Sequence, residues 1–165
     1  AAICADKSTF LPDRQLDEDV NALLRLKGGG KGVLSISQVA TGEENGLTLR
    51  VYAEKGAIKW AHENPNYLEL YRYGEPRQTL TRAQGYLSEA ADDSTRIPAG
   101  HPEGYLEGFA TIYVGVVEAI RQYIDGGPMK TEEYNFPTVY DGLRGMQFIY
   151  RAVESCNNNS AWVSM

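Results

Sequence analysis

The chain has 165 residues, of which 42% are hydrophobic and 23% are charged, proportions that are ordinary for a globular protein. No run of apolar residues approaches the roughly 18 that a membrane-spanning helix needs, so no membrane partner is expected. The formal net charge is −6 and the lysines and arginines are scattered, which argues against binding to nucleic acid through its phosphates.

The first half of the chain predicts a series of strands joined by tight turns. Residues 28–32 and the Asn45-Gly46 pair are expected to form hairpin turns, because glycine and Asn-Gly sequences favour them. Strands joined by such short turns pair antiparallel, since parallel neighbours need a crossover of about a dozen residues. The strands are expected at residues 3–11, 20–26, 33–40, 47–53, 57–62, 67–73 and 78–81.

The glycine-rich stretch 28–32 is not expected to bind a phosphate. A P-loop or a dinucleotide-binding turn has a helix directly after its glycines, whereas a strand-like run follows here. Lys31-Gly32 also lacks the Ser or Thr that follows the lysine of a P-loop. No cofactor-binding residues are therefore predicted in this chain.

A long helix is predicted after the strands. It is expected to have Pro102 in its first turn, where proline is tolerated, and Glu103 facing the positive end of the helix dipole. The glycines and proline of residues 126–128 are expected to end it. A broad apolar stripe is expected to press this helix against the sheet, and its members are Tyr105, Phe109, Ile112, Val116, Ile120 and Tyr123.

A second helix is predicted to begin near Thr138, with Asp141 completing a variant of the capping box. It is expected to end at residues 157–159, before a short closing strand at 161–163 that joins the edge of the sheet. Strands followed by helices are typical of an α+β fold. The prediction is a large, mostly antiparallel open sheet of about six to seven strands with helices packed on one face.

Residues 100–107, Gly-His-Pro-Glu-Gly-Tyr-Leu-Glu, resemble the GHPEGYLE signature of the C-terminal domain of Gfo/Idh/MocA-type NAD(P)-dependent oxidoreductases. Many members of that family act on sugars and cyclitols. Residues 51–57, 136–146 and 160–163 are similar to a central hairpin, a late helix and the final strand of the same domain. The chain departs from the family pattern after Leu106, at Gly108, Thr111 and Val114-Gly115.

The resemblance implies that residues 1–165 are a single C-terminal domain for substrate binding and oligomerisation, with the N-terminal Rossmann cofactor domain absent from this chain. The intact protein is then expected to use NAD or NADP on a hydroxyl or carbonyl group of a sugar or polyol. The chain alone is expected to bind no cofactor and to be inactive. The alternative is a free-standing, non-catalytic module for ligand binding or dimerisation.

His101 is the main candidate for substrate binding, because a residue just before a helix can face a cleft and an imidazole can hydrogen-bond a sugar hydroxyl. A second interpretation makes His101 a partner that caps the loop at residues 95–100. Arg96 and Tyr105 share this loop and are the other candidates, although Tyr105 also begins the apolar stripe and so favours a core position. No catalytic residue is predicted in the chain.

Tyr67, Tyr71 and Tyr73 alternate with leucines, so tyrosines and leucines are expected on opposite faces of one strand. Tyr52 is expected nearby on its own strand. Leucines that face the helices leave the tyrosines outward, and tyrosine-rich patches are typical of protein interfaces. The prediction is a homo-oligomer that forms through this face, and the alternative is that solvent tolerates the tyrosines.

Cys4 and Cys156 lie near opposite ends of the chain. Two thiols without a spacing pattern fit the reducing cytoplasm better than a disulfide scaffold, so a cytoplasmic location is expected. Together with only two histidines they do not suggest a zinc site, and no metal ligand is predicted.

Overall fold

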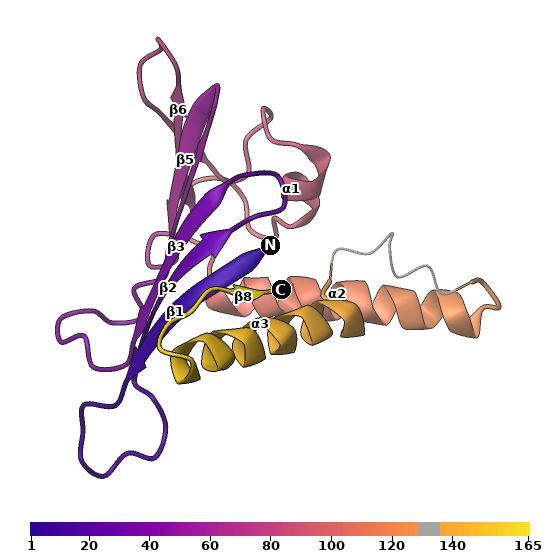
Figure 1. The fold of residues 1–165 in the computed structure, drawn as a ribbon. Coiled ribbons are helices and arrows are strands. Elements are labelled where there is room, and N and C mark those ends of the chain that lie inside the picture. Colours follow the sequence, from indigo (N-terminus) through magenta and orange to yellow (C-terminus); the bar gives the residue numbers. More distant parts are fainter. Residues whose placement is uncertain (129–135) are drawn as a thin grey trace. The chain divides into compact units, whose positions relative to one another are not determined.

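The computed structural model describes residues 1–128 and 136–165, and it has an α+β fold (Figure 1). The elements in chain order are β1 (Ala2–Ser8), β2 (Asp19–Arg25), β3 (Lys31–Ser37), β4 (Thr48–Ala53), β5 (Gly56–Ala61), β6 (Tyr67–Arg72), β7 (Gln78–Thr81), α1 (Glu89–Asp93), α2 (Tyr105–Ile124), α3 (Val139–Asn157) and β8 (Val163–Ser164). The chain divides into two compact units, Ala1–Gly42 with Pro137–Met165, and Glu43–Phe136. They are called here the first unit and the second unit.

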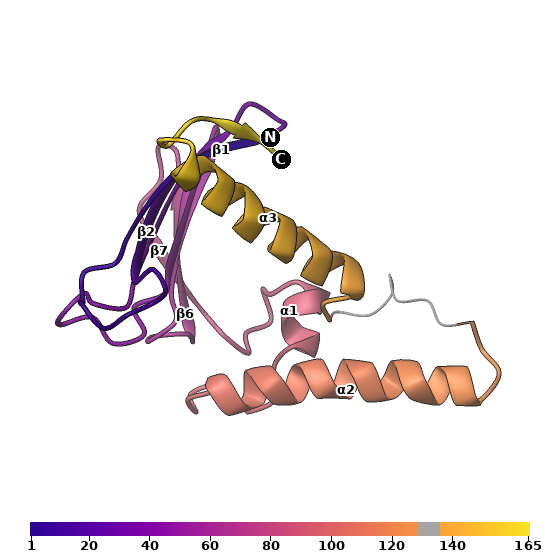
Figure 2. The same cartoon turned by 60° about the horizontal axis from the view of Figure 1, so that its bottom comes forward.

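The first unit contains a four-stranded antiparallel sheet in the order β3-β2-β1-β8. Helix α3 packs on β1 and β8, as both Figure 1 and Figure 2 show. The fully buried centre between the sheet and the helix is formed by Ile3, Ala5 and Ala22, and partly buried side chains from both layers surround it. The predicted closing strand is present, at Val163–Ser164 instead of residues 161–163, and it pairs with Ala2 and Ile3 at the edge of the sheet.

The turn between β2 and β3 is the hairpin that the glycines predict. The Leu26 N–H donates to the Gly30 carbonyl at 2.8 Å, and Gly29 has a φ of 83°, which glycine adopts readily. The start of α3 is also as predicted. Its N-cap is Thr138, whose backbone N–H and hydroxyl both donate to the Asp141 carboxylate at 2.8 Å.

The second unit contains another four-stranded antiparallel sheet, in the order β4-β5-β6-β7. Successive side chains of a strand alternate between the two faces of a sheet, and directly paired residues share a face. Applied to this register, the rule places Leu49, Val51, Ile58, Trp60, Leu68 and Leu70 on one face. The opposite face carries the tyrosines, so the predicted separation of tyrosines from leucines is confirmed.

The α+β class and the antiparallel pairing are therefore confirmed, with the strands hydrogen-bonded as two four-stranded sheets. Residues 38–47 lie between β3 and β4 and form turns rather than strand. Gly42 and Gly46 in this segment have φ values of 99° and 42°, which are not strand conformations.

Helix α2 differs from the prediction at its start and along its apolar stripe. It begins at Tyr105, with Gly104 as N-cap, so Pro102 and Glu103 precede the helix instead of forming its first turn. The reason is that the Glu103 carboxylate binds the preceding loop. The predicted burial of the stripe is also wrong for this chain, because Phe109, Ile120 and Tyr123 are exposed and Ala119 alone is buried.

The short helix α1 was not predicted, since its five residues are too few to give a helical apolar pattern. In residues 1–128 and 136–165, no helix is both long enough and apolar enough to cross a membrane. Cys4 and Cys156 are free thiols.

Candidate functional site

Residues 100–104 of the GHPEGY signature belong to a loop between α1 and α2, which we call the motif loop and define as residues 96–104, and Tyr105 is the first residue of α2. It contains a turn in which the His101 N–H donates to the Pro98 carbonyl at 3.3 Å. Gly100 lies inside this turn with a φ of 82°, a conformation that residues with a Cβ rarely adopt. Glycine at position 100 therefore allows the turn that presents His101.

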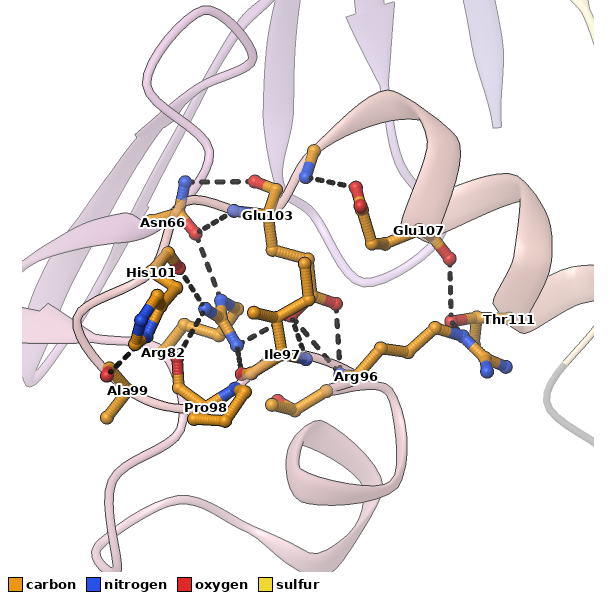
Figure 3. A network of polar contacts seen from close by, with 12 residues as sticks. Asn66, Arg82, Arg96, Ile97, Pro98, Ala99, His101, Glu103, Glu107 and Thr111 are labelled. Carbon is orange, nitrogen blue, oxygen red and sulfur yellow. Dashed lines mark hydrogen bonds and ion pairs between the residues drawn. The ribbon is translucent and has the colours of Figure 1, made fainter.

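Arg82, the residue directly after β7, donates hydrogen bonds to backbone carbonyl groups of the motif loop (Figure 3). Its Nη1 donates to the Ile97 carbonyl at 2.5 Å, and its Nη2 donates to the carbonyls of His101 at 2.5 Å and Pro98 at 3.4 Å. A guanidinium has five N–H donors in a fixed plane, so one side chain can hold several carbonyls of a loop at once. Arg82 thereby fixes the backbone on both sides of Gly100.

The Glu103 carboxylate also binds the backbone of the motif loop, near the start of the loop. It accepts hydrogen bonds from the backbone N–H groups of Arg96 and Ile97 at 3.1 Å, and it forms an ion pair with Arg82 at 2.6 Å. The Glu103 and Arg82 side chains are only 7% and 16% exposed. Charge-assisted hydrogen bonds between groups shielded from water are among the strong ones in proteins.

Asn66, in the turn before β6, completes this anchor. Its side-chain amide pairs with the backbone of Glu103, donating to the carbonyl at 2.9 Å and accepting from the N–H at 3.0 Å. The same Asn66 oxygen accepts from the Arg82 Nε at 3.0 Å. A turn of the sheet, the end of β7 and the motif loop are therefore joined by three polar side chains, called here the Asn66–Arg82–Glu103 anchor.

Glu107, and not Glu103 as predicted, is the acidic residue in the first turn of α2. Its carboxylate accepts from the Gly104 N–H at 2.9 Å, and this hydrogen bond holds the pKa of Glu107 below its ordinary value. One turn further on, the Thr111 hydroxyl donates to the Glu107 carbonyl and accepts from the Arg96 Nε, both at 2.9 Å. The first turns of α2 thus hold the side chain of Arg96.

The predicted substrate-binding residues all lie on or next to this anchored loop. The His101 ring is exposed, and its Nδ1 lies 3.3 Å from the Ala99 carbonyl. His101 and Arg96 point to opposite sides of Arg82 (Figure 3), so the structure does not bring these two side chains together. Tyr105 is 66% exposed and packs on Phe109 with ring centroids 4.9 Å apart, which contradicts the core position that its place in the stripe favoured.

Sequence reasoning missed Asn66 and Arg82. Asn66 was assigned to a turn, and Arg82 follows a strand in a sequence with no distinctive pattern. The residues of the anchor are far apart in sequence, since Asn66 and Glu103 are separated by 37 positions, so no local sequence pattern connects them. The one local signal is the signature itself, whose Glu103 needs a cationic partner once it is shielded from water.

Tyr52, Tyr67 and Tyr71 of the predicted interface lie on the face of the second sheet that is opposite the leucines. We call this the tyrosine face, and by register it is formed by Thr48, Arg50, Tyr52, Ala57, Lys59, Ala61, Tyr67, Glu69, Tyr71, Thr79 and Thr81. Tyr52 is 77% exposed and Tyr67 is also exposed. Tyr73 lies in the turn after β6, outside the strand in which it was predicted, and is 92% exposed.

Tyr71 and Glu69 interact on the tyrosine face. The Tyr71 hydroxyl donates to the Glu69 carboxylate, and this hydrogen bond lowers the pKa of Glu69 and raises the pKa of Tyr71. The cations Lys59, Arg77 and Arg50 add to the lowering for Glu69. This carboxylate is therefore charged at neutral pH and is surrounded by positive charge.

The described residues offer exposed hydrogen-bonding groups but no complete catalytic set. Within residues 1–128 and 136–165, no three His, Cys, Asp or Glu side chains gather closely enough to hold a metal ion. The side chains of His101 and Arg96 can hydrogen-bond the hydroxyl groups of a ligand, and the Tyr105 ring can contact its apolar face. The chemistry that this arrangement supports is recognition and orientation.

Comparisons with known proteins find oxidoreductases. A family model described as "Oxidoreductase family, C-terminal alpha/beta domain" (GFO_IDH_MocA_C) matches residues 4–165. The chain is 30% identical over 98% of its length to "Uncharacterized oxidoreductase YfiI" of Bacillus subtilis (strain 168), of which it covers 41%.

Solved structures give the same result. An oxidoreductase from Sinorhizobium meliloti shares 45% identity with a TM-score of 0.89, over 99% of this chain and 46% of that one. An inositol dehydrogenase homologue from Azotobacter vinelandii, complexed with NADH and myo-inositol, shares 28% identity with a TM-score of 0.93, over 99% of this chain and 44% of that one. The chain thus spans less than half the length of these relatives, and it belongs to the Gfo/Idh/MocA oxidoreductase family, as the C-terminal alpha/beta domain.

Proposed function

We propose that this chain is the substrate-binding and oligomerisation domain of an NAD(P)-dependent oxidoreductase that acts on a hydroxyl or carbonyl group of a sugar or polyol. The observation that carries the proposal is its likeness, over 99% of its length, to the inositol dehydrogenase homologue crystallised with NADH and myo-inositol. Because the chain covers only 44% of that relative, we assign the nucleotide-binding Rossmann domain to the remainder of the intact protein.

In this proposal the hydride passes between the substrate carbon and the nicotinamide of NAD or NADP, which the other domain binds. The present domain supplies a wall of the substrate pocket, and by itself it binds no nucleotide and is inactive. This division agrees with the general rule that the cofactor supplies the redox chemistry while the protein positions the substrate against it.

The proposed substrate contacts come from the motif loop and from the first residue of α2. The His101 Nδ1 donates to the Ala99 carbonyl, so its Nε2 accepts a hydrogen bond from a substrate hydroxyl group. Arg96 donates to a substrate hydroxyl group, and Tyr105 borders the pocket with its ring. The support for this role is that the Asn66–Arg82–Glu103 anchor fixes the loop while leaving the His101 side chain exposed. A loop that is ordered before the substrate binds loses less conformational entropy on binding.

The proposed oligomer forms between copies of the chain through the tyrosine face. The support is the exposure of Tyr52 and Tyr67 on this face and of Tyr73 in the turn after β6, because large amphipathic rings give contact area at interfaces. We also place the protein in the cytoplasm, a proposal that rests on its two free cysteines.

The test compares this 165-residue chain with the intact oxidoreductase. Titration with NAD⁺ and NADP⁺ is expected to give binding to the intact protein and none to the isolated chain. Reduction of the cofactor is then assayed against a panel of polyols and sugars that begins with myo-inositol. Tight nucleotide binding by the isolated chain, or an intact protein that oxidises no member of the panel, would contradict the proposal.

The role of His101 is tested in the same assay with His101→Ala. The expected result is a KM for the polyol raised about tenfold or more with the KM for the nucleotide unchanged, since a neutral hydrogen bond contributes about 1.5 kcal/mol. His62→Ala is the matched control, because the His62 Nδ1 contacts Asn45 in the turn before β4, a segment separate from the motif loop.

A further inference from the structure

We infer that the chain modifies itself at Asn45, in the segment directly before β4. The backbone nitrogen of Gly46 attacks the Asn45 side chain, with Glu63 as the general base and His62 as the general acid. Asn45 is thereby converted to aspartate and isoaspartate. This reaction needs neither the motif loop nor a substrate, so it is independent of the proposed function.

Asn45 and Gly46 are a sequence pair that suits this reaction. The nitrogen of one residue must reach the side-chain amide carbon of the residue before it, and a side chain on the attacking residue obstructs that approach. Gly46 has no side chain, so its backbone can be approached closely. Both residues are exposed and lie outside the strands, so the sheet hydrogen bonds do not hold their backbone. The nucleophile and the carbon that it attacks are therefore neighbours in an accessible turn.

Glu63 holds the proton that the nucleophile must lose. The Gly46 N–H donates to the Glu63 Oε1 at 3.1 Å, and the Asn45 N–H donates to the same oxygen at 3.0 Å. An amide nitrogen becomes nucleophilic as its proton leaves, and a carboxylate within hydrogen-bond distance of that proton can accept it. The second hydrogen bond, from the Asn45 N–H, fixes the carboxylate in this position.

His62 contacts the nitrogen that must leave. The Asn45 Nδ2 donates to the His62 Nδ1 at 3.2 Å. The backbone N–H of His62 donates to the Leu47 carbonyl at 2.9 Å, and its ring meets the Trp60 ring edge-on with centroids 6.1 Å apart, so the imidazole is held in place. Imidazole exchanges a proton readily near neutral pH, which suits it to protonate a departing amine.

The reaction balances without an oxidant or a cofactor. A bond forms between the Gly46 nitrogen and the Asn45 Cγ, and the nitrogen gives its proton to the Glu63 carboxylate. The Cγ–Nδ2 bond then breaks, its electron pair stays on Nδ2, and the protonated His62 imidazole supplies the proton with which ammonia departs. The product is a cyclic imide. Water opens it at either carbonyl to give aspartate or isoaspartate, and solvent restores the protonation of both groups.

The product changes the turn before β4. A carboxylate replaces the amide group that contacted His62, and it lies near the Glu63 carboxylate, which binds the backbone N–H of the same residue. Like charges at this distance repel one another. Isoaspartate also lengthens the backbone of the turn by one carbon atom. The modification is therefore expected to accumulate with the age of the protein and to weaken the hydrogen bonds of this turn.

The test incubates the intact protein at neutral pH and follows the peptide that contains residue 45 by chromatography and mass spectrometry. A mixture of aspartate and isoaspartate is expected. Glu63→Gln keeps an oxygen that accepts both N–H groups but cannot take up a proton, and His62→Gln removes the acid. Each variant is expected to react about a hundredfold more slowly, the lower end of what a general acid or base contributes. Circular dichroism first shows that the variants are folded as the wild type is.

Glu43→Gln is the matched control. The Glu43 carboxylate lies beside Gly46, 2.9 Å from the position of an added Cβ, whereas the Gly46 N–H donates to Glu63. Glu43→Gln is expected to react at the rate of the wild type. If E43Q is slowed and E63Q is not, the assignment of Glu63 as the base is wrong.

A synthetic peptide of residues 41–50 gives the rate of the same Asn-Gly pair without His62 and Glu63. The folded protein is expected to react faster than this peptide. A folded protein that reacts no faster than the peptide, or E63Q and H62Q proteins that react as fast as the wild type, would overturn the inference. Aspartate formed without isoaspartate would also overturn it, because water would then have attacked the side chain directly.

Discussion

The Arg82 guanidinium lies 2.6 Å from the Glu103 carboxylate, although the two residues come from opposite ends of the segment that joins β7 to α2. Both side chains also bind the backbone of the motif loop. The ion pair therefore holds this loop in place. The signature sequence therefore has a folding role in this chain that is independent of any ligand.

Removing one member of this ion pair is expected to destabilise the second unit strongly. Arg82→Ala leaves the shielded Glu103 carboxylate without its cation, which typically costs about 3 kcal/mol of unfolding free energy. Arg82→Lys is expected to recover only part of the loss, because an ammonium group cannot reproduce the planar set of donors. Urea denaturation followed by circular dichroism measures both values.

Arg144→Ala is the matched control for Arg82. Its guanidinium is 79% exposed and lies 3.7 Å from Asp141, and such surface pairs contribute about 0 to 1 kcal/mol. An Arg82→Ala protein as stable as Arg144→Ala would show that the ion pair does not hold the motif loop.

The start of α2 is expected to lose stability in acid. Hydrogen bonding to the Gly104 N–H lowers the pKa of Glu107 in the folded chain, so its carboxylate stabilises the fold above its ordinary pKa. That contribution is lost as the pH falls below the ordinary pKa of glutamate and through the lowered folded value. Thermal unfolding of wild type and Glu107→Gln, measured from about pH 7 to about pH 3, should give curves that differ at neutral pH and converge in acid.

Glu118→Gln, in the same helix but away from its first turn, controls for the general effect of removing a carboxylate. Its difference from the wild type is expected to be smaller than that of Glu107→Gln at neutral pH. A difference between wild type and Glu107→Gln that stays constant down to the lowest pH would contradict the capping role.

Gly56 is expected to be essential for the hairpin between β4 and β5. A Cβ added at this position would overlap the backbone oxygen of Tyr71 and lie 3.3 Å from the Arg72 Cα, neither of which can move without separating β5 from β6. Gly56→Ala is therefore expected to lower the unfolding free energy by about 2 kcal/mol, the middle of the range for overpacking. Differential scanning calorimetry measures the loss.

Gly108→Ala is the comparison for Gly56→Ala, because a Cβ at position 108 meets no atom within 4 Å. Gly108 lies inside α2, where alanine is better than glycine by about 1 kcal/mol, so this variant is expected to be more stable than the wild type. A destabilised Gly108→Ala chain would contradict the open space seen at this position.

Local rules predicted those parts of the fold that depend on neighbouring residues. The hairpin at Gly29, the cap formed by Thr138 and Asp141, and the alternation of tyrosines and leucines on β6 all follow from short sequence patterns. The start of α2 did not follow, because Glu103 binds Arg82 and the backbone of Ile97, and neither contact can be read from spacing. Tertiary contacts of a single carboxylate moved the helix start by several residues.

The candidate site was predicted only in part for the same reason. His101 and Arg96 were identified because they belong to a recognisable signature, whereas Asn66 and Arg82 lie outside it and reach the motif loop only in the folded chain. Tyr105 was placed in the core by its helical periodicity, yet periodicity gives the face of a helix and not what covers it.

Ser155 connects α3 to β1 and to the segment before β8, and its hydroxyl is expected to be required for stability. The Ser155 Oγ accepts from the Ala5 N–H of β1 at 2.8 Å and donates to the Ala161 carbonyl at 2.6 Å, and the side chain is fully buried in α3. Ser155→Ala leaves the Ala5 N–H without this partner, and a buried unsatisfied donor costs about 1 to 3 kcal/mol. Urea denaturation should show that loss with an unchanged slope, whereas Ser35→Ala, on an exposed position of β3, should remain within about 0.5 kcal/mol of the wild type. Equal stability of the two variants would mean that water or a backbone shift replaces the hydroxyl, and that the link from α3 to β1 depends on apolar packing alone.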